Sequence, residues 1–445
     1  MMENNRRKQR SMVYQGSWLG FLLLIFLPIQ SSAEDWPQWR GPNRDGVWNN
    51  PQVVKSFAAD PIPHKWSVPV APGYSGPTVA KGLVYLTDRP ESDEQLERIL
   101  CFDAVTGESV WKLAYPCEYR NIGYQAGPRA SVTVDAGQAF ALGAMGHLHV
   151  LDAVTGELQW KSDLLDRFKI KIPIWGIAAA PIVTKDLVIL MIGGRPDACV
   201  VALNRHTGDE VWRSLSDLTS YAAPILIEQA GKSVLVCWTG DNIVGLNPAN
   251  GEVYWKSEMP PKNMVIAIAT PVVHNGRLFV TSFYDGAKML QLDEKTTSAE
   301  ELWRARGPSE LDTDALHSIM STPIMIGDYV YGVDSYGELR CLEAKTGKRI
   351  WEDQTATPRN RWSNIHMVRN GEHVWMFNER GELVIAKLSP AGFEEISRAK
   401  LIEPTEAQLK RRGQGVCWSH PAFADGHVFI RSDTQLVCAS LLEGE

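Results

Sequence analysis

Short hydrophobic runs alternate with polar turns along most of this chain. In the plainest example, an alternating run ends at Asp152, a turn closes on Gly156, and a second short run reaches Trp160. Asp at the start of a turn can accept hydrogen bonds from backbone groups two residues on, and Gly supplies the positive φ that a tight hairpin needs. The pattern therefore predicts a strand, a tight turn and a second strand.

The same hairpin recurs along the chain. In five copies an Asp, Asn or Glu precedes a Trp by eight residues, and these pairs are Asp103 and Trp111, Asp152 and Trp160, Asn204 and Trp212, Asn247 and Trp255, and Glu343 and Trp351. A sixth copy, from Asp293 to Trp303, is two residues longer and lacks the Gly. A repeated hairpin of this kind indicates an array of similar units.

A second marker precedes each hairpin: a small residue and Pro, then two alternating apolar runs. Counted by this marker, and allowing two copies without Pro, eight units begin near positions 77, 131, 181, 224, 271, 323, 367 and 421. The steps between them, 43 to 54 residues, accommodate four strands with their turns. Four strands in a repeat of this length are typical of a β-propeller. The sequence predicts an all-β fold, an eight-bladed β-propeller with four-stranded blades.

The two ends of the repeat array complement one another. Trp66 marks a fourth strand that no first three strands precede, whereas residues 420–439 supply three strands without a Trp-bearing fourth. We expect the two ends to complete one blade, which closes the ring without an exposed sheet edge. The fourth strands carry a repeated Trp, which we expect to fill the space between neighbouring blades; these residues are Trp66, Trp111, Trp160, Trp212, Trp255, Trp303 and Trp351, with Ile396 in the remaining copy.

The N-terminal region has a different composition. Four basic residues precede the apolar run Trp18–Ile29, and small residues follow at Ser31 and Ala33. This order predicts a signal peptide over residues 1–33, with an uncleaved membrane anchor as the alternative. Residues 34–60, rich in Trp and Pro, are expected to form a lead-in that packs over a propeller face. Residues 61–445 are expected to form the propeller itself.

The net charge of the chain narrows the range of partners. The chain carries a net charge of −7, and 41 basic and 51 acidic residues would remain after cleavage, a net charge of −10. An acidic surface argues against nucleic acid and anionic membranes as partners.

The seven cysteines include no adjacent pair and no CxxC motif, and Cys101, Cys341 and Cys438 occupy one repeat position inside the third strand. We expect mostly buried free thiols.

The repeats resemble the pyrroloquinoline-quinone (PQQ) type of β-propeller repeat over nearly all of residues 61–440. The motif from Trp36 to Gly46 looks like one that introduces many secreted BamB-like members of this family. The resemblance implies either a BamB-like scaffold without cofactor or a quinoprotein alcohol dehydrogenase that holds PQQ and Ca²⁺ in its funnel. The dehydrogenases share a vicinal Cys–Cys disulfide, which this chain lacks. No cofactor is therefore expected, and PQQ and Ca²⁺ belong to the alternative.

Other candidate chemistry is sparse. His147 and His149 alternate on a predicted strand and could bind a metal ion, but a solvated strand face is the favoured interpretation. The acidic run Glu91–Glu97 is interpreted as a solvated insert within the first blade. The sequence contains no GxSxG motif, P-loop or dinucleotide fingerprint.

The candidate binding residues lie just before the first strand of each unit, where the innermost strands begin at the funnel mouth. They are Tyr74, Arg129, Trp175, Tyr221, His317, Trp362, His366, Trp418 and His420, with Arg361 and Asn364 close by. Polar and aromatic side chains that converge on one opening favour a binding surface. The alternative is a water-filled polar channel.

These observations predict an exported, monomeric, non-catalytic binding or scaffold protein of the periplasm or the cell exterior. Its partners would be envelope proteins or an extracellular ligand, and it would not be an integral membrane protein once the signal is cleaved. The alternatives are a PQQ-dependent alcohol dehydrogenase and an envelope sensor that binds carbohydrate or peptide.

Overall fold

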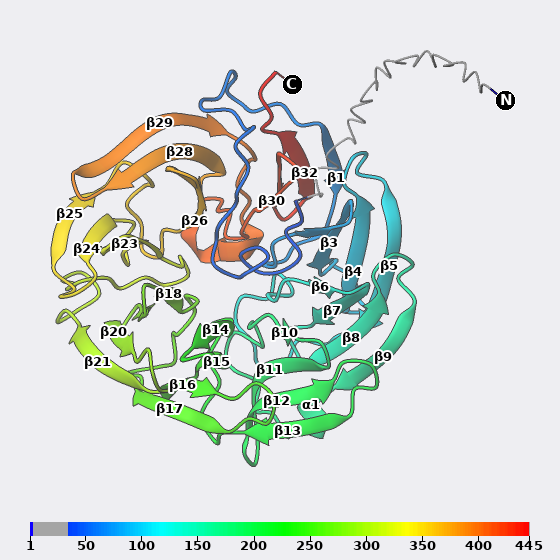
Figure 1. Ribbon diagram of the computed structural model, residues 1–445, viewed down its shortest axis with the longest axis horizontal. Coiled ribbons are helices and arrows are strands. Elements are labelled where there is room, and N and C mark those ends of the chain that lie inside the picture. Colours follow the sequence, from blue (N-terminus) through cyan, green and yellow to red (C-terminus); the bar gives the residue numbers. More distant parts are fainter. Residues whose placement is uncertain (3–33, 445) are drawn as a thin grey trace. The chain divides into compact units, whose positions relative to one another are not determined.

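The chain forms a ring of eight four-stranded antiparallel sheets, an eight-bladed β-propeller (Figure 1). The computed structural model describes residues 1–2 and 34–444, so the predicted signal peptide lies almost wholly outside the described residues. Within the described part, helix is limited to α1 (Leu164–Arg167) and the 3₁₀ helix η1 (Ala407–Arg412). No described helix has the length and hydropathy that a membrane span requires.

Seven blades are continuous in sequence. Blade 1 contains β2 (Thr78–Ala80), β3 (Leu83–Asp88), β4 (Leu96–Asp103) and β5 (Ser109–Pro116), and blade 2 contains β6 (Thr133–Asp135), β7 (Gln138–Leu142), β8 (His147–Asp152) and β9 (Leu158–Asp163). Blade 3 contains β10 (Ile182–Val183), β11 (Leu187–Gly194), β12 (Ala198–Asn204) and β13 (Glu210–Ser214), and blade 4 contains β14 (Ile225–Gln229), β15 (Lys232–Trp238), β16 (Asn242–Leu246) and β17 (Val253–Glu258).

The second half of the ring follows the same plan. Blade 5 contains β18 (Val272–His274), β19 (Arg277–Ser282), β20 (Gly286–Leu292) and β21 (Ala299–Ala305), and blade 6 contains β22 (Ile324–Ile326), β23 (Tyr329–Val333), β24 (Leu339–Glu343) and β25 (Arg349–Asp353). Blade 7 contains β26 (Ile365–Asn370), β27 (His373–Asn378), β28 (Glu382–Ser389) and β29 (Gly392–Lys400). The predicted unit starts are confirmed, because each first strand begins within two residues of its marker.

Blade 8 is assembled from both ends of the propeller. Its sheet has the order β1 (Trp66–Pro69), β32 (Gln435–Ser440), β31 (His427–Arg431) and β30 (Ala422–Ala424). β1 pairs antiparallel with β32, and Trp66 lies opposite Cys438. The predicted closure of the ring by the two ends is confirmed.

The recurring hairpin turn has the predicted chemistry. The Asp103 carboxylate accepts hydrogen bonds from the backbone N–H groups of Val105 and Thr106 at 2.9 and 2.8 Å. Asp293 accepts the same pair of bonds, from Lys295 and Thr296, although its turn has lost the Gly. The Asp side chain therefore organises the turn even where the Gly is absent.

Each repeated Trp bridges two blades. Trp160 lies in blade 2, and its indole N–H donates to the Arg205 carbonyl in blade 3 at 2.8 Å. The turn glycine of that next blade, Gly208, lies under the ring, and a Cβ built there would come within 2.7 Å of Trp160. The turn of blade 5 that begins at Asp293 lacks Gly. There the Trp255 indole of blade 4 donates to the Gln229 side chain, and the Gln229 amide donates to the Ser298 carbonyl of that turn.

The lead-in segment, residues 34–60, crosses the middle of the ring, and its dark-blue trace is visible there in Figure 1. Trp36 forms a backbone bridge with Val79 in blade 1, and the Trp48 N–H donates to the Arg369 carbonyl in blade 7 at 2.7 Å. Between these anchors, the Arg44 guanidinium donates to the Ala180 carbonyl of the blade 3 lead-in at 3.1 Å. The segment thus connects blades on opposite sides of the ring.

Two sequence interpretations are wrong. His149 does not lie on a solvated strand face: it is buried, its ring lies 4.2 Å from that of Tyr115, and burial lowers its pKa to about 4. Glu97, assigned to a solvated insert, lies in β4 and is fully buried, where it accepts hydrogen bonds from the hydroxyls of Tyr115 and Tyr119 at 2.6 and 2.5 Å. Both side chains occupy the interface between blades 1 and 2, which alternation along a single strand does not reveal.

The cysteine prediction is confirmed. All seven cysteines are free and buried, and Cys101, Cys341 and Cys438 lie inside third strands as expected. Burial raises the pKa of the Cys101 thiol to about 12, so this thiol stays protonated at neutral pH. These residues act as small apolar core residues.

Candidate functional site

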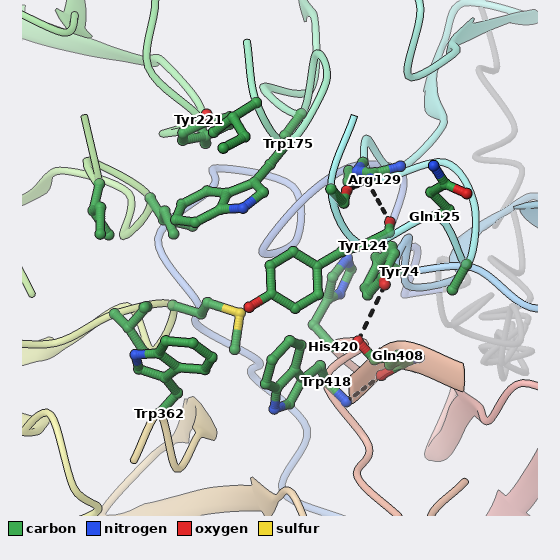
Figure 2. A pocket seen from close by; sticks show the side chains of 18 of the residues that line it. Tyr74, Tyr124, Gln125, Arg129, Trp175, Tyr221, Trp362, Gln408, Trp418 and His420 are labelled. Atoms are coloured by element: carbon green, nitrogen blue, oxygen red, sulfur yellow. Dashed lines mark hydrogen bonds between the residues drawn. The ribbon is translucent and has the colours of Figure 1, made fainter. Parts of the chain in front are cut away.

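The segments that precede the first strands converge on one cavity of about 960 Å³ (Figure 2). Eight of the nine sequence candidates line it, and these are Tyr74, Arg129, Trp175, Tyr221, Trp362, His366, Trp418 and His420. Arg361, named as a neighbour of the candidates, also lines the cavity. The geometry therefore gathers candidates from six blades around one space, and residues such as Ile268 and Ile319 add lining from blades 5 and 6.

His317 is the candidate that the structure does not place in the cavity. Its side chain is buried, its Nε2 accepts the Gly307 N–H at 3.1 Å, and its Nδ1 donates to the Phe283 carbonyl at 3.0 Å. Both ring nitrogens are thus used within the packing of blades 5 and 6. Asn364 is also buried and lies outside the cavity lining.

The floor of the cavity consists of Trp39, Ser131, His366 and His420. The rings of Trp39 and His420 lie 4.4 Å apart and nearly perpendicular, and the Ser131 hydroxyl lies 2.6 Å from His420 Nε2. Burial lowers the pKa of His420 to about 3 and that of His366 to about 4. Both imidazoles are therefore neutral at neutral pH, and the floor is aromatic and uncharged.

An aromatic wall rises from this floor. Figure 2 shows Trp175, Tyr124 and Trp418 around the cavity, and the ring of Tyr124 lies 6.0 Å from each of the two indoles. Tyr221 extends the wall, with its ring 5.1 Å from that of Trp175. The wall thus joins side chains of blades 2, 3, 4 and 8 into one aromatic cluster, with the Tyr124 and Trp175 rings packed edge to face.

Two of the aromatic residues adopt a left-handed backbone conformation. Tyr124 has φ 55° and Trp362 has φ 71°. Bulky residues rarely adopt this conformation, which costs about 1–3 kcal/mol and is concentrated at functional sites. This strain supports a role for the two side chains beyond packing.

Basic side chains surround the aromatic wall. Arg129 donates to the carbonyls of Gly123 and Tyr124 at 2.8 and 2.5 Å. The Arg411 guanidinium lies 3.9 Å from the centre of the Trp362 ring and donates to the Tyr124 hydroxyl. Arg89 and Lys410 also line the cavity. Within the described part of the chain, none of these four cations forms an ion pair with a carboxylate.

Sequence reasoning missed several lining residues. Trp39 belongs to the lead-in segment, whereas Tyr124 and Arg411 lie further back in the connections from β5 to β6 and from β29 to β30, ahead of the residues that precede each first strand. A partial signal exists, because Lys410–Arg412 is a basic run immediately before the last repeat of an acidic protein. Nothing in the repeat pattern indicates that this run reaches the cavity.

The residues of the cavity do not fit the Ca²⁺ site of the dehydrogenases. Ca²⁺ binds six to eight oxygen ligands, mostly from carboxylates and carbonyls. Glu91 is the one carboxylate among the described lining residues, and the described part of the chain contains no cluster of three or more His, Cys, Asp or Glu side chains suited to a metal ion.

A family model described as outer membrane protein assembly factor BamB matches residues 95–353. The chain belongs to the BamB family. The matched range excludes the lead-in segment and several cavity residues, including Tyr74, Trp362 and Trp418. Membership of the BamB family therefore accounts for the repeats but not for the whole cavity.

Curated BamB relatives are distant. The BamB of Shewanella oneidensis is 23% identical over 227 residues, which cover 50% of this chain and 56% of that protein. The BamB of Yersinia pestis is 22% identical over 219 residues, which cover 48% of this chain and 53% of that protein. The chain spans about half the length of the curated relatives it matches.

Solved structures show the same fold. BamB from Moraxella catarrhalis superposes with a TM-score of 0.57 at 16% identity, covering 86% of this chain and 98% of that one. Quinohemoprotein alcohol dehydrogenase from Comamonas testosteroni superposes with a TM-score of 0.64 at 14% identity, covering 91% of this chain and 80% of that one. At such identities the likeness shows the propeller fold alone, which both named branches of the resemblance share.

Proposed function

We propose that this BamB-family protein is an exported, monomeric binding module of the cell envelope that has no catalytic activity. The observation that carries the proposal is the cavity, where an aromatic wall and unpaired cations meet over an uncharged floor. Aromatic and Arg side chains are the residue types that dominate binding energy at protein interfaces. The name of the curated relatives, outer membrane protein assembly factor, supports an envelope protein as the partner.

Truncating the aromatic wall tests this proposal. Trp175→Ala and Trp362→Ala should each weaken binding of a native envelope partner by more than about 1 kcal/mol, because large aromatic side chains provide most of the contact energy. Melting temperatures should stay close to that of the wild type, since both side chains are only partly buried. Affinity capture from the native envelope, followed by titration of the captured protein, measures the effect.

Leu311→Ala provides a matched control. Leu311 is an exposed apolar side chain, 68% accessible, and it lies outside the cavity lining. This variant should capture the same partners as the wild type. Recovery of unchanged partners by Trp175→Ala and Trp362→Ala would place the binding surface elsewhere on the molecule.

A separate measurement tests the absence of redox catalysis. The purified protein, mixed with PQQ and Ca²⁺, should show neither a bound-quinone absorption spectrum nor dye-linked alcohol oxidation. The physical reason is the lack of carboxylate ligands around the cavity, where Glu91 is the one described carboxylate of the lining. Turnover of an alcohol that depends on both additions would overturn the proposal.

A further inference from the structure

The first residue of the lead-in segment is bound where the ring closes. The Glu34 backbone N–H donates to the Asp425 carboxylate at 2.6 Å, and the Asp425 N–H donates back to the Glu34 carbonyl at 3.3 Å. The Glu34 carboxylate accepts the Trp48 indole N–H at 2.9 Å and the Asn49 backbone N–H at 3.2 Å. The backbone and the side chain of Glu34 are therefore both part of the folded structure.

The next residue holds the neighbouring blade. The Asp35 carboxylate accepts the Lys81 backbone N–H at 2.9 Å, in the turn between β2 and β3 of blade 1. Asp425 lies in the corresponding turn between β30 and β31 of blade 8, and β2 packs against β30. Two consecutive lead-in residues thus bind the inner hairpins of the two blades that meet where the ring closes.

The groups around the Glu34 nitrogen favour a positive charge. The Asp35 carboxylate lies close enough to Asp425 for the two to repel: burial raises the pKa of Asp35, and Asp425 adds to the rise, whereas the Lys81 N–H and ammonium oppose it. His427 is the other titratable side chain here, and its ring contacts the Asp425 carbonyl at 2.7 Å. Within the described part of the chain, neither Asp35 nor Asp425 forms an ion pair. A cation at the Glu34 nitrogen would therefore balance acids that have no ionic partner.

The predicted cleavage of the signal peptide falls at the same atom. Ser31 and Ala33 are the small residues that a signal peptidase reads, so hydrolysis breaks the peptide bond between Ala33 and Glu34. Water supplies the second oxygen of the Ala33 carboxylate and the two protons that the Glu34 nitrogen gains. The amide N–H thereby becomes an α-ammonium group, which is charged at neutral pH and bonds a carboxylate more strongly than a neutral N–H does.

We propose that removal of the signal peptide before Glu34 creates an ion pair between the new α-ammonium group and Asp425, which fixes the lead-in segment at the junction of blades 1 and 8. This pair rests on the proposed export of the protein and goes beyond it, because it assigns a structural role to the processed terminus. The lead-in segment contributes Trp39 to the cavity lining, so the same pair anchors part of the candidate site.

The identity of the mature N-terminus is the first test. The full-length chain is expressed in a bacterial host, and the protein recovered from the envelope fraction is analysed by intact mass and N-terminal sequencing. Glu34 should be its first residue. A different first residue, or a protein that keeps the signal segment in the envelope, would overturn the ion pair, because no α-ammonium group would then lie at this nitrogen.

The charge of the α-amino group is measured by pulse labelling with acetic anhydride, which reacts with the unprotonated amine. At neutral pH the mature protein should label at least about fivefold more slowly than Asp425→Asn, because an adjacent carboxylate raises the pKa of the amine. The pair is complete below the ordinary pKa of an α-amino group and is lost as the pH rises through the raised value. At about pH 10.5 both proteins should label at the same rate, since both amines are then unprotonated.

Asp186→Asn provides the matched control. Asp186 is an exposed residue in the corresponding turn of blade 3, between β10 and β11, so this variant should label at the rate of the wild type. Asp425 has φ 48°, a conformation that Asn also adopts, so Asp425→Asn should keep its turn. Circular dichroism checks that both variants are folded.

The outcomes separate the ion pair from the proposed function. Equal labelling of the mature protein and Asp425→Asn at neutral pH would overturn the pair. A difference of the same size at both pH values would also overturn it, because such a difference reflects access to the amine and not its charge. In either case, partner capture that depends on Trp175 and Trp362 would leave the binding module intact. Retention of the precursor in the cytoplasm would instead overturn the proposed export.

Discussion

At the scale of single residues, the turn glycines serve two purposes. Gly208 has φ +76°, which favours glycine, and it also lies directly under the Trp160 ring of the preceding blade. A methyl group there would come within 2.7 Å of the indole. The same contact recurs at Gly107, Gly156, Gly251 and Gly347, each beneath a Trp of the neighbouring blade. The repeated Gly is therefore required both by the geometry of the turn and by the contact between blades.

Two alanine substitutions separate these purposes. Gly137 has φ +80° and no heavy atom within 4 Å of a built Cβ, so Gly137→Ala should lower the free energy of unfolding by about 1–2 kcal/mol through backbone strain alone. Gly208→Ala should cost about 1–3 kcal/mol more, because the methyl group also overpacks against Trp160. Urea denaturation of both variants measures the difference.

Trp160→Ala completes the comparison. Removing the ring should itself lower stability by about 3–5 kcal/mol, the usual cost of emptying a large aromatic site. In the Trp160→Ala background the extra cost of Gly208→Ala over Gly137→Ala should disappear. Persistence of that extra cost would show that the Trp contact is not its cause.

At the scale of elements, blade 8 differs from the other blades because its strands come from both ends of the propeller. β1 is held to β32 by antiparallel pairing, without a covalent turn between them. The expectation that Ile396 takes the position of the repeated Trp in blade 7 is wrong: Ser397 pairs with Ile385 as Trp111 pairs with Cys101, and Ile396 lies in the adjacent bulge. Blade 8 has no hairpin turn on which a Trp of blade 7 could pack. Blade 7 therefore lacks the Trp at the one place in the ring where the next blade lacks the turn that would contact it.

Proline substitutions in β1 test the closure. The Val70 N–H donates to the Thr434 carbonyl at 3.1 Å, and bonds in an antiparallel ladder alternate, so the Val68 N–H also faces β32 whereas that of Ser67 points away. Val68→Pro should cost about 3 kcal/mol of unfolding free energy, because it removes a ladder bond. Ser67→Pro should cost clearly less, because an outward N–H of an edge strand tolerates Pro.

Two smaller variants serve as controls for these prolines. Val68→Ala measures the lost packing of the half-buried Val68 side chain, and Ser67→Ala measures the loss of the hydroxyl bond to Gln435. Thermal melting of the four variants provides the comparison. Equal losses in Val68→Pro and Ser67→Pro would contradict the role of the β1–β32 ladder in closing the ring.

At the scale of the whole molecule, the lead-in segment links distant blades and contributes Trp39 to the cavity lining. Trp39 reaches across the ring to donate to the Thr270 hydroxyl of blade 5 at 2.7 Å, and its ring forms part of the floor. Arg44 is buried against backbone carbonyls, and burial lowers its pKa to about 9, so it stays charged at neutral pH. Those carbonyls replace the water that the guanidinium has lost. The segment thus joins distant blades and supplies the base of the cavity.

Much of the candidate site follows from the repeat. In a propeller the segment before each innermost strand faces the central axis, so position within the repeat was enough to bring Tyr74, Trp175 and Trp362 to one cavity. His317 occupies a similar position but turns into the packing between blades, where its ring nitrogens find backbone partners. Position predicts proximity to the axis, whereas the direction of a side chain depends on its neighbours.

The sequence by itself determined the number of blades, their four strands, the closure by both ends and the burial of the cysteines. These features depend on local alternation and turn chemistry, and the same pattern recurs in each repeat. Only the tertiary structure decided that Trp39 forms the floor, that Arg411 packs on Trp362, and that Glu97 and His149 are buried between blades. Those placements arise from contacts between residues far apart in the chain, and no local pattern encodes such contacts.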